Sequence, residues 1–574
     1  MVCRSSWIDR AELVVALLAC LPACSGDDTQ AATTSTATTT TGAGGGGSGG
    51  AGGGAPTGPI DGAVGRYDIA FDLASRAATF QLGVDVAPPG GDCWSVACGL
   101  PVTDVTWNDA PATSGVVDGN ALAACGPGVP GGGALAVAAR TVVPEQTFLG
   151  LDVGYSVLDD MDGGKFSYLL SWVGGCDRFG PCDDDPSRLV EVHLDVTHPE
   201  GTTVLCPGLR TDDAGGTHCD IAGTLAPTYS GVALAADPLW VRTPFTQAAG
   251  VDLVFYEVPS GKLAASLDPT SVGAFMDWIT GRLGPFPYGN ELRFAGGPTA
   301  WLGFEHPANI ILYEDLPSLN GPYGDPTMHV TMHEVVHQWA GDRTTLASTL
   351  DFVWKEATAE YLAYVFEDEQ RPPGEAAASL AYWDAASLGA NWHPRPLDEP
   401  PPDVEDFYGD VYGPGPMVLY VQLESLLRRD KVLTAIASFL AQPGARSVDD
   451  LQKALEAASG SDLQAYFDAW VYGTGMPEWP TVSVAATQQG DQVNVTLTQL
   501  GATPYGCVVE VDVVGATSTA TALVDFGPAP TAAQASADVT LAEPFTSLVV
   551  DPRHRLVAKV MGAADPPPVV VWPL

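Results

Sequence analysis

The sequence is poor in positive charge. Only 25 of its 574 residues are Lys or Arg, against 69 Asp and Glu, which gives a formal net charge of −44. A chain this acidic repels polyanions, so its composition argues against nucleic acid as a partner and against electrostatic binding to anionic lipid. We expect a solvated acidic surface of the kind that keeps an exported protein soluble.

Long apolar runs are also scarce, and the C-x-x-C spacing is absent. The apolar run from Leu13 to Leu21 is far shorter than the roughly 20 residues needed to cross a bilayer. No C-x-x-C pair occurs, which argues against a cysteine metal site. Hydrophobic residues nevertheless make up 46% of the chain, ample for sizeable cores, and a length of 574 residues predicts several domains.

The N-terminus has the composition of an export signal. Arg4 and Arg10 precede the apolar run, and Cys20 and Cys24 both follow segments that resemble the bacterial lipoprotein box. Cys24 is the better candidate for lipidation because polar sequence begins directly after it. We therefore expect residues 1–24 to be a lipoprotein-type signal and the protein to be anchored at a bacterial outer membrane. A simply cleaved signal, giving a periplasmic or secreted protein, is the alternative.

Residues 25–64 are rich in Thr and Gly. No core can form from such a stretch, so we predict a disordered tether that lets a globular body stand away from a lipid anchor.

Export also predicts disulfide bonds. Eight cysteines follow the tether: Cys93, Cys98, Cys125, Cys176, Cys182, Cys206, Cys219 and Cys507. Their even number favours disulfides, mainly within the domain that holds seven of them. The close pairs Cys93/Cys98, Cys176/Cys182 and Cys206/Cys219 are plausible, but the sequence leaves the connectivity open.

The pattern of apolar residues divides the remaining chain into three domains. Period-two alternation with Gly and Pro breaks predicts a β-rich, antiparallel domain over residues 65–248. Helical periodicity, beginning at Asp268-Pro269, dominates residues 249–477. The period returns to two over residues 478–574 and predicts a small β-sandwich. The predicted fold class is therefore multidomain α+β.

Two histidines form the motif with the clearest chemistry. His333 and His337 are four residues apart and lie one turn apart on one helix face. Neutral imidazoles so placed can hold Zn²⁺, and Glu334 beside them can take a proton from a metal-bound water. Eighteen residues separate His337 from Glu356, enough for a second helix to return a carboxylate to the metal. Two histidines and one glutamate leave a fourth position open for water, as catalytic zinc requires.

The surroundings of the motif argue against two merely solvated histidines. Thr331, Met332, Val335, Val336 and Trp339 make this helix largely apolar around the imidazoles. Burying two imidazoles and a carboxylate without partners would be costly. We therefore predict one zinc ion per chain.

Four further segments, together with the motif, resemble the aminopeptidase-N family of gluzincin metallopeptidases. They are Gly284-Pro285-Phe286-Pro287-Tyr288, Gly303-Phe304-Glu305-His306-Pro307, Tyr412-Gly413-Pro414-Gly415 and Trp470-Val471-Tyr472-Gly473-Thr474-Gly475-Met476-Pro477. The resemblance covers roughly residues 66–560. It implies a β-saddle domain, a thermolysin-like catalytic domain and a β-sandwich, without the large C-terminal helical domain of many relatives.

The resemblance also implies roles for single residues. Zinc-bound water attacks the scissile carbonyl with Glu334 as general base, and Tyr412 stabilises the oxyanion. Glu305 pairs with the free α-amine of the substrate, so that the enzyme removes one residue from the N-terminus. On sequence alone, Tyr412 would be a loop tyrosine and Glu305 a surface carboxylate.

Two residues near the motif, Glu360 and His329, are not expected to be metal ligands. Glu360 lies one turn after Glu356 and either orients a metal-binding histidine or is simply solvated. His329 lies one turn before His333, and we expect it to be packed or exposed rather than a ligand, because the ligand set is complete without it.

The sequence departs from the family pattern near the amine pocket. Phe304 stands where relatives have Met, Lys355 replaces the Asn before the third ligand, Ala357 replaces the following Gly, and Pro414 replaces a Lys. None of these positions is a metal ligand, the base or the tyrosine. The departures therefore concern the recognition of the amine rather than zinc hydrolysis.

Three functions remain in competition. The sequence favours an exported zinc aminopeptidase acting on peptides with a free N-terminus, with membrane contact only through a lipid anchor. A zinc endopeptidase is disfavoured by the spacing to Glu356 and by the Glu305 segment. A non-catalytic binding protein that retains the peptidase fold is disfavoured because the base and all the ligands are present.

Overall fold

The computed structural model describes residues 60–561, apart from 88–90, 119, 130–132, 147–152, 222–224 and 373. These residues belong to one compact unit, Ala55–Leu574. The predicted signal at 1–24, with Cys24, lies outside the described residues, as does most of the predicted tether. Strand β1 (Gly62–Asp72) begins inside the tether that was predicted to reach residue 64.

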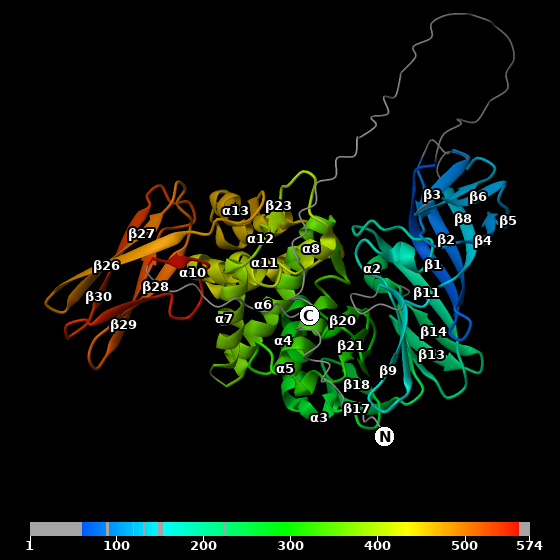
Figure 1. The fold of residues 1–574 in the computed structure, drawn as a ribbon, viewed down its shortest axis with the longest axis horizontal. Coiled ribbons are helices and arrows are strands. Elements are labelled where there is room, and N and C mark those ends of the chain that lie inside the picture. Colours follow the sequence, from blue (N-terminus) through cyan, green and yellow to red (C-terminus); the bar gives the residue numbers. More distant parts are fainter. Residues whose placement is uncertain are drawn as a thin grey trace, which may run out of the picture. The chain divides into compact units, whose positions relative to one another are not determined.

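The N-terminal part is β-rich and centres on a nine-stranded sheet (Figure 1). Residues in β1 and β2 (Ala77–Val86) alternate in burial, as the period-two pattern predicts. The strand order is β13-β14-β11-β1-β2-β8-β4-β5, with β15 paired to β11. The further strands are β4 (Thr103–Trp107), β5 (Ala110–Pro111), β8 (Gly133–Val142), β11 (Leu189–Thr197), β13 (Leu209–Asp213), β14 (Gly216–Asp220) and β15 (Ala226–Pro227).

This sheet is mixed rather than wholly antiparallel. β1 pairs with β11 in parallel. The chain between them is long enough for the crossover that parallel pairing needs, so the prediction of an antiparallel domain was wrong at this pair. Two smaller sheets accompany it. One has the order β12-β16-β10-β9 and the other β3-β7-β6. Their bounds are β3 (Cys93–Ala97), β6 (Ser114–Asp118), β7 (Ala121–Cys125), β9 (Gly154–Asp159), β10 (Lys165–Leu170), β12 (Thr203–Leu205) and β16 (Ala233–Asp237).

Three disulfides cross-link this β-rich part, as export predicts. Cys176–Cys182 and Cys206–Cys219 join the expected close pairs, but the third bond is Cys93–Cys125. The pairing Cys93/Cys98 was wrong because Cys93 lies directly opposite Cys125 in the antiparallel β3–β7 pair, with 4.0 Å between the Cα atoms. Cys98 lies beyond the end of β3 and is a free, buried thiol, as is Cys507.

A five-stranded sheet follows and supports the site. Its order is β17-β18-β19-β21-β20, where β17 spans Val241–Ala248, β18 Val251–Glu257, β19 Glu291–Gly297, β20 Gly303–His306 and β21 Asn309–Tyr313. β17 is an edge strand of this sheet, so the sheet begins before the domain boundary predicted at residue 249. β20 and β21 form a tight antiparallel hairpin. Helix α4 (Pro269–Leu283) starts at the predicted position, where the Asp268 side chain accepts hydrogen bonds from two backbone N–H groups.

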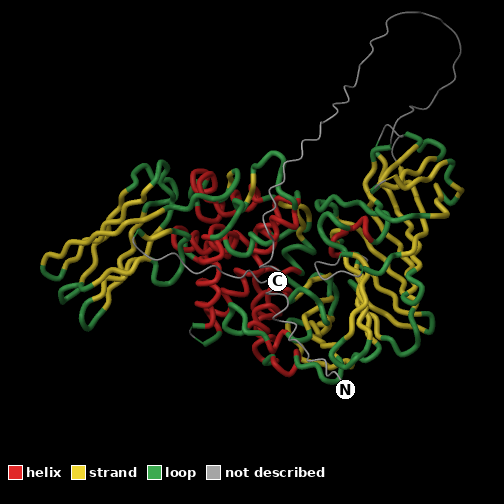
Figure 2. The backbone as a smooth tube through the Cα atoms, viewed as in Figure 1, coloured by secondary structure: helices red, strands yellow, loops and turns green. Residues whose placement is uncertain are grey.

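Helices dominate the next part of the chain (red in Figure 2). The two that matter most are α5 (Pro326–His337) and α6 (Phe352–Gln370), which pack against each other. The others are α7 (Glu375–Leu388), α8 (Val404–Tyr408), α9 (Pro414–Pro416), which continues into a π-helical turn at Met417–Val421, α10 (Gln422–Leu427), α11 (Arg429–Phe439), α12 (Val448–Ser459) and α13 (Gln464–Trp470).

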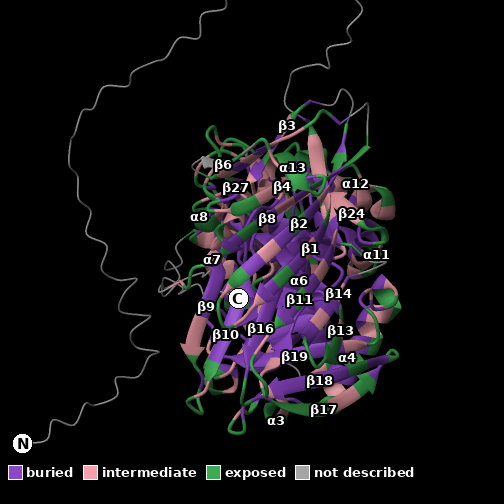
Figure 3. Cartoon of the chain, turned by 90° about the vertical axis from the view of Figure 1, so that its right-hand side faces the viewer, coloured by how far each residue is buried: buried purple, intermediate pink, exposed green. Residues whose placement is uncertain are grey.

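The chain returns to strands after residue 480. One sheet has the order β30-β27-β26-β32 and the other β29-β28-β31. The strands are β26 (Thr481–Gln489), β27 (Gln492–Leu500), β28 (Val508–Val514), β29 (Thr519–Asp525), β30 (Gln534–Thr540), β31 (Ser547–Val550) and β32 (Lys559–Val560). Buried residues, purple in Figure 3, gather along the central strands and α6. Among the described residues, no helix is both long and apolar enough to span a membrane.

Candidate active site

Helices α5 and α6 present the predicted metal ligands to each other. Asp325 caps α5 by accepting a hydrogen bond from the Met328 N–H at 3.2 Å, and Pro326 occupies the first turn. Every residue from Thr327 to His337 is buried, so the two imidazoles lie inside the protein. α6 is buried over most of its length as well and carries Glu356 in its second turn. The spacing in the sequence therefore brings all three side chains to one interior position.

The ligand atoms of these three residues converge. His333 Nε2 and His337 Nε2 are 2.9 Å apart. Glu356 Oε2 lies 3.3 Å from the first nitrogen and 3.4 Å from the second. The three atoms fall within the 4.8 Å limit for a group that can share one ion. This is a compact set of two nitrogens and one oxygen, which suits zinc.

A hydrogen bond on the far side of its ring fixes the tautomer of His337. His337 Nδ1 lies 2.8 Å from the Ala340 carbonyl oxygen, which can only accept, so Nδ1 carries the proton. His333 Nδ1 faces Glu360 Oε1 at 3.6 Å. Burial lowers the pKa of His333, which favours its neutral form. Both Nε2 lone pairs then point at the same place, and a metal ion is the group that satisfies such an arrangement.

Glu334 adds a second reason to expect a cation here. The side chain is 2% exposed, and its Oε2 has no hydrogen-bond partner among the described residues. Burial, together with the charges of Glu305 and Glu356, raises the pKa of Glu334 well above its ordinary value. A buried carboxylate among other carboxylates is unfavourable unless a positive charge compensates it. The residues present therefore fit a bound Zn²⁺ ion.

A second set of side chains competes for the ion. Glu305, Glu334 and His337 also bring ligand atoms within 4.8 Å of one another. That set has one imidazole and two carboxylates, whereas Glu356 turns its Oε2 to both histidine nitrogens and only its Oε1 to Lys355. The set His333, His337 and Glu356 is therefore the better ligand set for zinc, and it leaves Glu334 available as a base.

A glycine makes room for that base. Gly303 begins β20, and a Cβ atom at this position would lie 2.4 Å from Glu334 Oε1. No side chain larger than hydrogen fits there without moving the carboxylate. The close approach of β20 to α5 thus depends on this glycine.

Tyr412 lies on the other side of the ligand carboxylate. It is 1% exposed, and its hydroxyl donates a hydrogen bond to Glu356 Oε2 at 3.3 Å. Its ring packs edge-on against Tyr408, with 5.2 Å between the centroids. The segment that resembles the family's tyrosine motif therefore does place a hydroxyl beside the candidate metal centre.

The β20–β21 hairpin is fastened to the end of α5 by Gln338, which sequence reasoning missed. The Ala308 N–H donates to Gln338 Oε1 at 2.8 Å, and Gln338 Nε2 donates to the His306 carbonyl at 2.9 Å. The His306 ring is wholly buried, with Nδ1 3.1 Å from the Ser230 carbonyl oxygen, which indicates a packing role for this histidine. The only available signal was a polar residue directly after the second ligand, in an apolar setting. Gln338 holds the strand that carries Glu305.

Lys355, singled out as a departure from the family pattern, lies inside the site. Its Nζ is 2.8 Å from Glu305 Oε1 and 2.7 Å from Glu356 Oε1. The lysine is 3% exposed. Burial alone would raise the pKa of Glu356, but Lys355 and the two histidines hold it well below its ordinary value. The two carboxylates on either side of the site therefore share one internal cation.

Glu360 and His329 form a buried network next to the ligands. His329 Nε2 lies 3.0 Å from Glu360 Oε2, and Nδ1 lies 3.0 Å from Glu367 Oε1. Tyr323 donates to Glu360 Oε1 at 3.0 Å. Burial alone would lower the pKa of His329, but Glu367 and Glu360 raise it to about 10. The solvated alternative for Glu360 was thus wrong, and His329 is packed as a cation rather than aimed at the metal centre.

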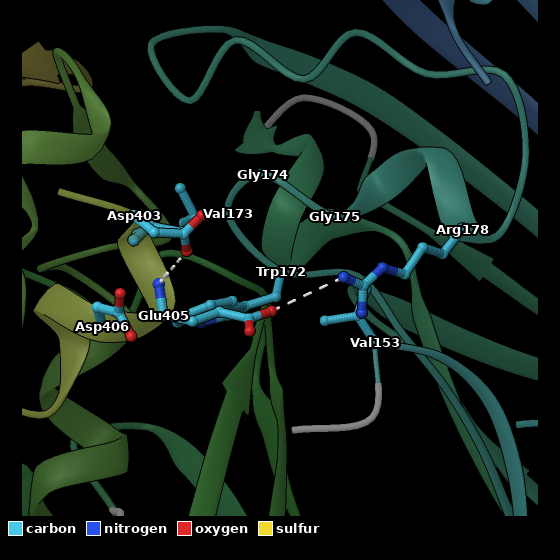
Figure 4. A pocket seen from close by; sticks show the side chains of 10 residues that line it. Val153, Trp172, Val173, Gly174, Gly175, Arg178, Asp403, Glu405 and Asp406 are labelled. Atoms are coloured by element: carbon cyan, nitrogen blue, oxygen red, sulfur yellow. Dashed lines mark hydrogen bonds and ion pairs between the residues drawn. The ribbon is translucent and has the colours of Figure 1, made fainter. Parts of the chain in front are cut away.

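A cavity of about 400 Å³ lies beside this site (Figure 4). Its walls come from the N-terminal part, including Trp172 and Arg178, and from α8 with the residue before it, Asp403 to Asp406. Arg178 and Glu405 face each other across it at 3.7 Å. None of the candidate ligands lines the cavity. Aromatic rings connect the cavity to the site. The ring centroids of Trp172 and Tyr408 are 5.1 Å apart, and Tyr408 packs against Tyr412.

Comparison with known proteins identifies the helical part. Residues 311–470 match the sequence model of the Peptidase family M1 domain. This part of the chain is therefore similar to the M1 peptidases. The M1 match begins in β21 and ends with α13, so it includes His333, His337, Glu356 and Tyr412 and begins just after Glu305.

Two curated proteins are similar to part of this chain. "Probable aminopeptidase 1" of Sulfurisphaera tokodaii is 26% identical over 173 residues, 29% of this chain and 21% of that protein. "Tricorn protease-interacting factor F2" of Thermoplasma volcanium is 24% identical over 176 residues, 29% of this chain and 22% of that protein. The matched region thus spans about a fifth of the length of these relatives.

The similarity to a solved structure is broader. The crystal structure of Legionella pneumophila aminopeptidase A in complex with aspartic acid superposes with a TM-score of 0.71 and 14% sequence identity. The match covers 88% of this chain and 60% of that one. At this identity the likeness is one of fold. The likeness of fold reaches beyond the helical part to most of the chain.

Proposed function

We propose that the protein is a zinc metallo-aminopeptidase that removes N-terminal residues from peptides. The observation that carries this proposal is the convergence of His333 Nε2, His337 Nε2 and Glu356 Oε2 beside the unpartnered Glu334 carboxylate, inside an M1 peptidase domain. The names of the similar proteins, which include two aminopeptidases, agree with it.

Each nearby side chain has a role that its position permits. Zinc held by His333, His337 and Glu356 would polarise the scissile carbonyl and lower the pKa of a bound water. Glu334 accepts the proton of the attacking water at its unpartnered oxygen and passes it to the leaving amine. The Tyr412 hydroxyl donates a hydrogen bond to the oxygen of the carbonyl under attack as it gains negative charge.

Glu305 is the proposed anchor for the substrate amine. Its carboxylate is 5% exposed, and one of its oxygens falls within 4.8 Å of ligand atoms of Glu334 and His337. A negative charge so close to the reacting centre attracts a terminal ammonium group to it. Such a contact would position the first peptide bond of the substrate at the metal.

A zinc endopeptidase is the second candidate, because Lys355 already occupies one oxygen of Glu305. A time course of products from an unblocked decapeptide separates the two. We expect the zinc-loaded enzyme to release single residues in order from the N-terminus, to stop when the metal is chelated, and to resume when zinc is restored. Internal fragments alone would favour the endopeptidase. No cleavage at full zinc content would favour the binding protein.

We also propose that the protein is exported, with Cys24 lipidated at a bacterial outer membrane. The three disulfides support export, since such bonds are typical of oxidising compartments. Labelling with a radioactive fatty acid tests the anchor, because wild type should be labelled and Cys24→Ala should not.

A finer division of the fold belongs to the same proposal. We assign residues 65–248 to a β-saddle, 249–477 to a thermolysin-like domain and 478–574 to a small β-sandwich. The TM-score of 0.71 over 88% of the chain supports a division of this kind. Strand β17 pairs with β18 in the five-stranded sheet, so it belongs with the second domain although it precedes residue 249.

A further inference from the structure

Lys355 fills the place that a substrate ammonium would be expected to take. Its Nζ bridges Glu305 Oε1 at 2.8 Å and Glu356 Oε1 at 2.7 Å. An α-ammonium group that paired with Glu305 would seek the same carboxylate. The pocket therefore already contains a cation before any peptide arrives.

The position of Lys355 is built into the fold. Its side chain is 4% exposed, and a Cβ atom on Gly341 would lie 2.7 Å from Lys355 Cε. Gly341 has φ of +138°, a conformation that side-chain-bearing residues rarely adopt. The loop after α5 thus leaves a channel for the lysine stem, and the Nζ lies 5.2 Å from the centre of the Phe352 ring.

The bridge changes what the pocket selects. Glu305 without a counter-ion would favour a charged N-terminus strongly, because the pair would form in a buried, poorly screened place. Glu305 paired with Lys355 is close to neutral, so it attracts an incoming ammonium less strongly than Glu305 alone would. An uncharged N-terminus, such as an N-acylated one, is therefore at a smaller disadvantage.

We propose that Lys355 is a specificity-determining residue that acts as an internal counter-ion of Glu305 and opens the site to peptides whose first residue carries no α-ammonium. This inference rests on the proposed peptidase function and concerns its substrate class. Lys355 takes no part in the bond cleavage. It sets the charge of the pocket in which the first residue binds.

A matched pair of substrates tests the proposal. We would measure kcat/KM for alanine p-nitroanilide and for its N-acetyl derivative, at the same zinc content. For wild type we expect the ratio of free to blocked substrate to stay within about tenfold, because the pocket is close to neutral. Lys355→Met should raise that ratio by about tenfold or more, mainly through a lower KM for the free amine, since a tenfold effect corresponds to one modest ionic contact.

Three further variants separate charge from shape. Lys355→Met combined with Glu305→Gln removes both charges and should return the ratio towards that of wild type. Glu305→Gln alone leaves the lysine paired only with Glu356 and should push the ratio below that of wild type. Lys453→Met removes an exposed lysine that pairs with Asp449 and should leave the ratio unchanged.

A purely structural lysine would give a different pattern. Lys355→Met would then lose zinc and lower kcat/KM equally for both substrates, with the ratio unchanged, and that result would overturn the proposal. Zinc content and thermal unfolding are measured for every variant. If Lys355→Met does not fold, Glu305→Gln still tests the proposal, because its ratio should fall below that of wild type, whereas the charge-balanced double variant should keep a ratio near that of wild type.

Failure of the peptidase proposal would look different. Zinc-loaded wild type would then hydrolyse neither substrate. The effect of Lys355 on amine binding can be tested in that case too. Calorimetry would measure how tightly the zinc-free protein binds alanine amide and N-acetylalanine amide. Lys355→Met should bind the free amide at least about tenfold more tightly relative to the blocked one than wild type does. Equal relative binding in the two proteins would overturn the inference.

Discussion

Single residues decide whether Glu334 can act as a base. Its position was predictable, because H-E-x-x-H fixes both its neighbours and its helix. The space it needs was not, since that space comes from Gly303 on a strand of the sheet. The spacing of His333, His337 and Glu356 likewise requires only that two helices pack. The bridge from Lys355 to Glu305 depends on a loop glycine and a hairpin, which no local pattern encodes.

Gly303→Ala tests the space for the base. The new Cβ would lie 2.4 Å from Glu334 Oε1, so the carboxylate must shift. We expect kcat to fall by about 10²-fold with zinc content unchanged, because misplacement of a reacting group by roughly 1 Å has an effect of that size. Gly409→Ala is the matched control, since a Cβ there meets nothing within 4 Å. Equal activity of the two variants would show that Glu334 needs no such space.

The ends of the helices depend on more than the periodicity of apolar residues. Sequence periodicity predicts the start of α4 at Asp268-Pro269, and the spacing of the motif predicts the two helices that carry His333, His337 and Glu356. Helix α5 ends at His337. The chain turns there because the His337 Nδ1–H donates a hydrogen bond to the Ala340 carbonyl and the Gly341 N–H donates one to the Thr344 carbonyl. The periodicity of apolar residues does not report such hydrogen bonds.

The α5–α6 pair is held partly by charge. His329 on α5 pairs at 3.0 Å with both Glu360 and Glu367 on α6, and all three are buried. We expect His329→Phe to lower the free energy of unfolding by about 3–5 kcal/mol, because it leaves two buried carboxylates without the cation they share. Urea denaturation measures the change. His554→Phe removes a half-exposed pair with Asp384 and should have an effect of about 1 kcal/mol or less. A similar small effect for His329→Phe would contradict the role assigned to the network.

At the scale of the whole molecule, acidity shapes stability as well as solubility. Composition predicted an acidic exterior but could not reveal that some carboxylates are buried together. Asp237 and Asp160, from β16 and the end of β9, are both buried, and each has an oxygen without a hydrogen-bond partner among the described residues. Burial and the nearby Asp160 raise the pKa of Asp237 to about 7, and burial raises the pKa of Glu314 to about 7.

These shifts predict how stability depends on pH. The folded protein holds protons on Asp237 and Glu314 that the unfolded chain releases near pH 4, so the folded state binds more protons between about pH 4 and pH 7. Stability from these groups is complete below that window and is lost as pH rises through it. Asp237→Asn should therefore gain stability relative to wild type from pH 4 to pH 7, by at most about 4 kcal/mol. Thermal unfolding at pH 4.5, 6 and 7.5 measures the difference, and a constant difference would contradict the shift.

The central claim is that the molecule hydrolyses peptides at a zinc ion held by His333, His337 and Glu356, with Glu334 as the base. Metal analysis combined with hydrolysis of an amino-acid amide by wild type and Glu334→Gln tests it most directly. We expect about one zinc per chain in both proteins and a loss of turnover of about 10³-fold or more in the variant, since the amide cannot accept the proton. A Glu334→Gln protein that keeps its zinc and hydrolyses at the wild-type rate would contradict it.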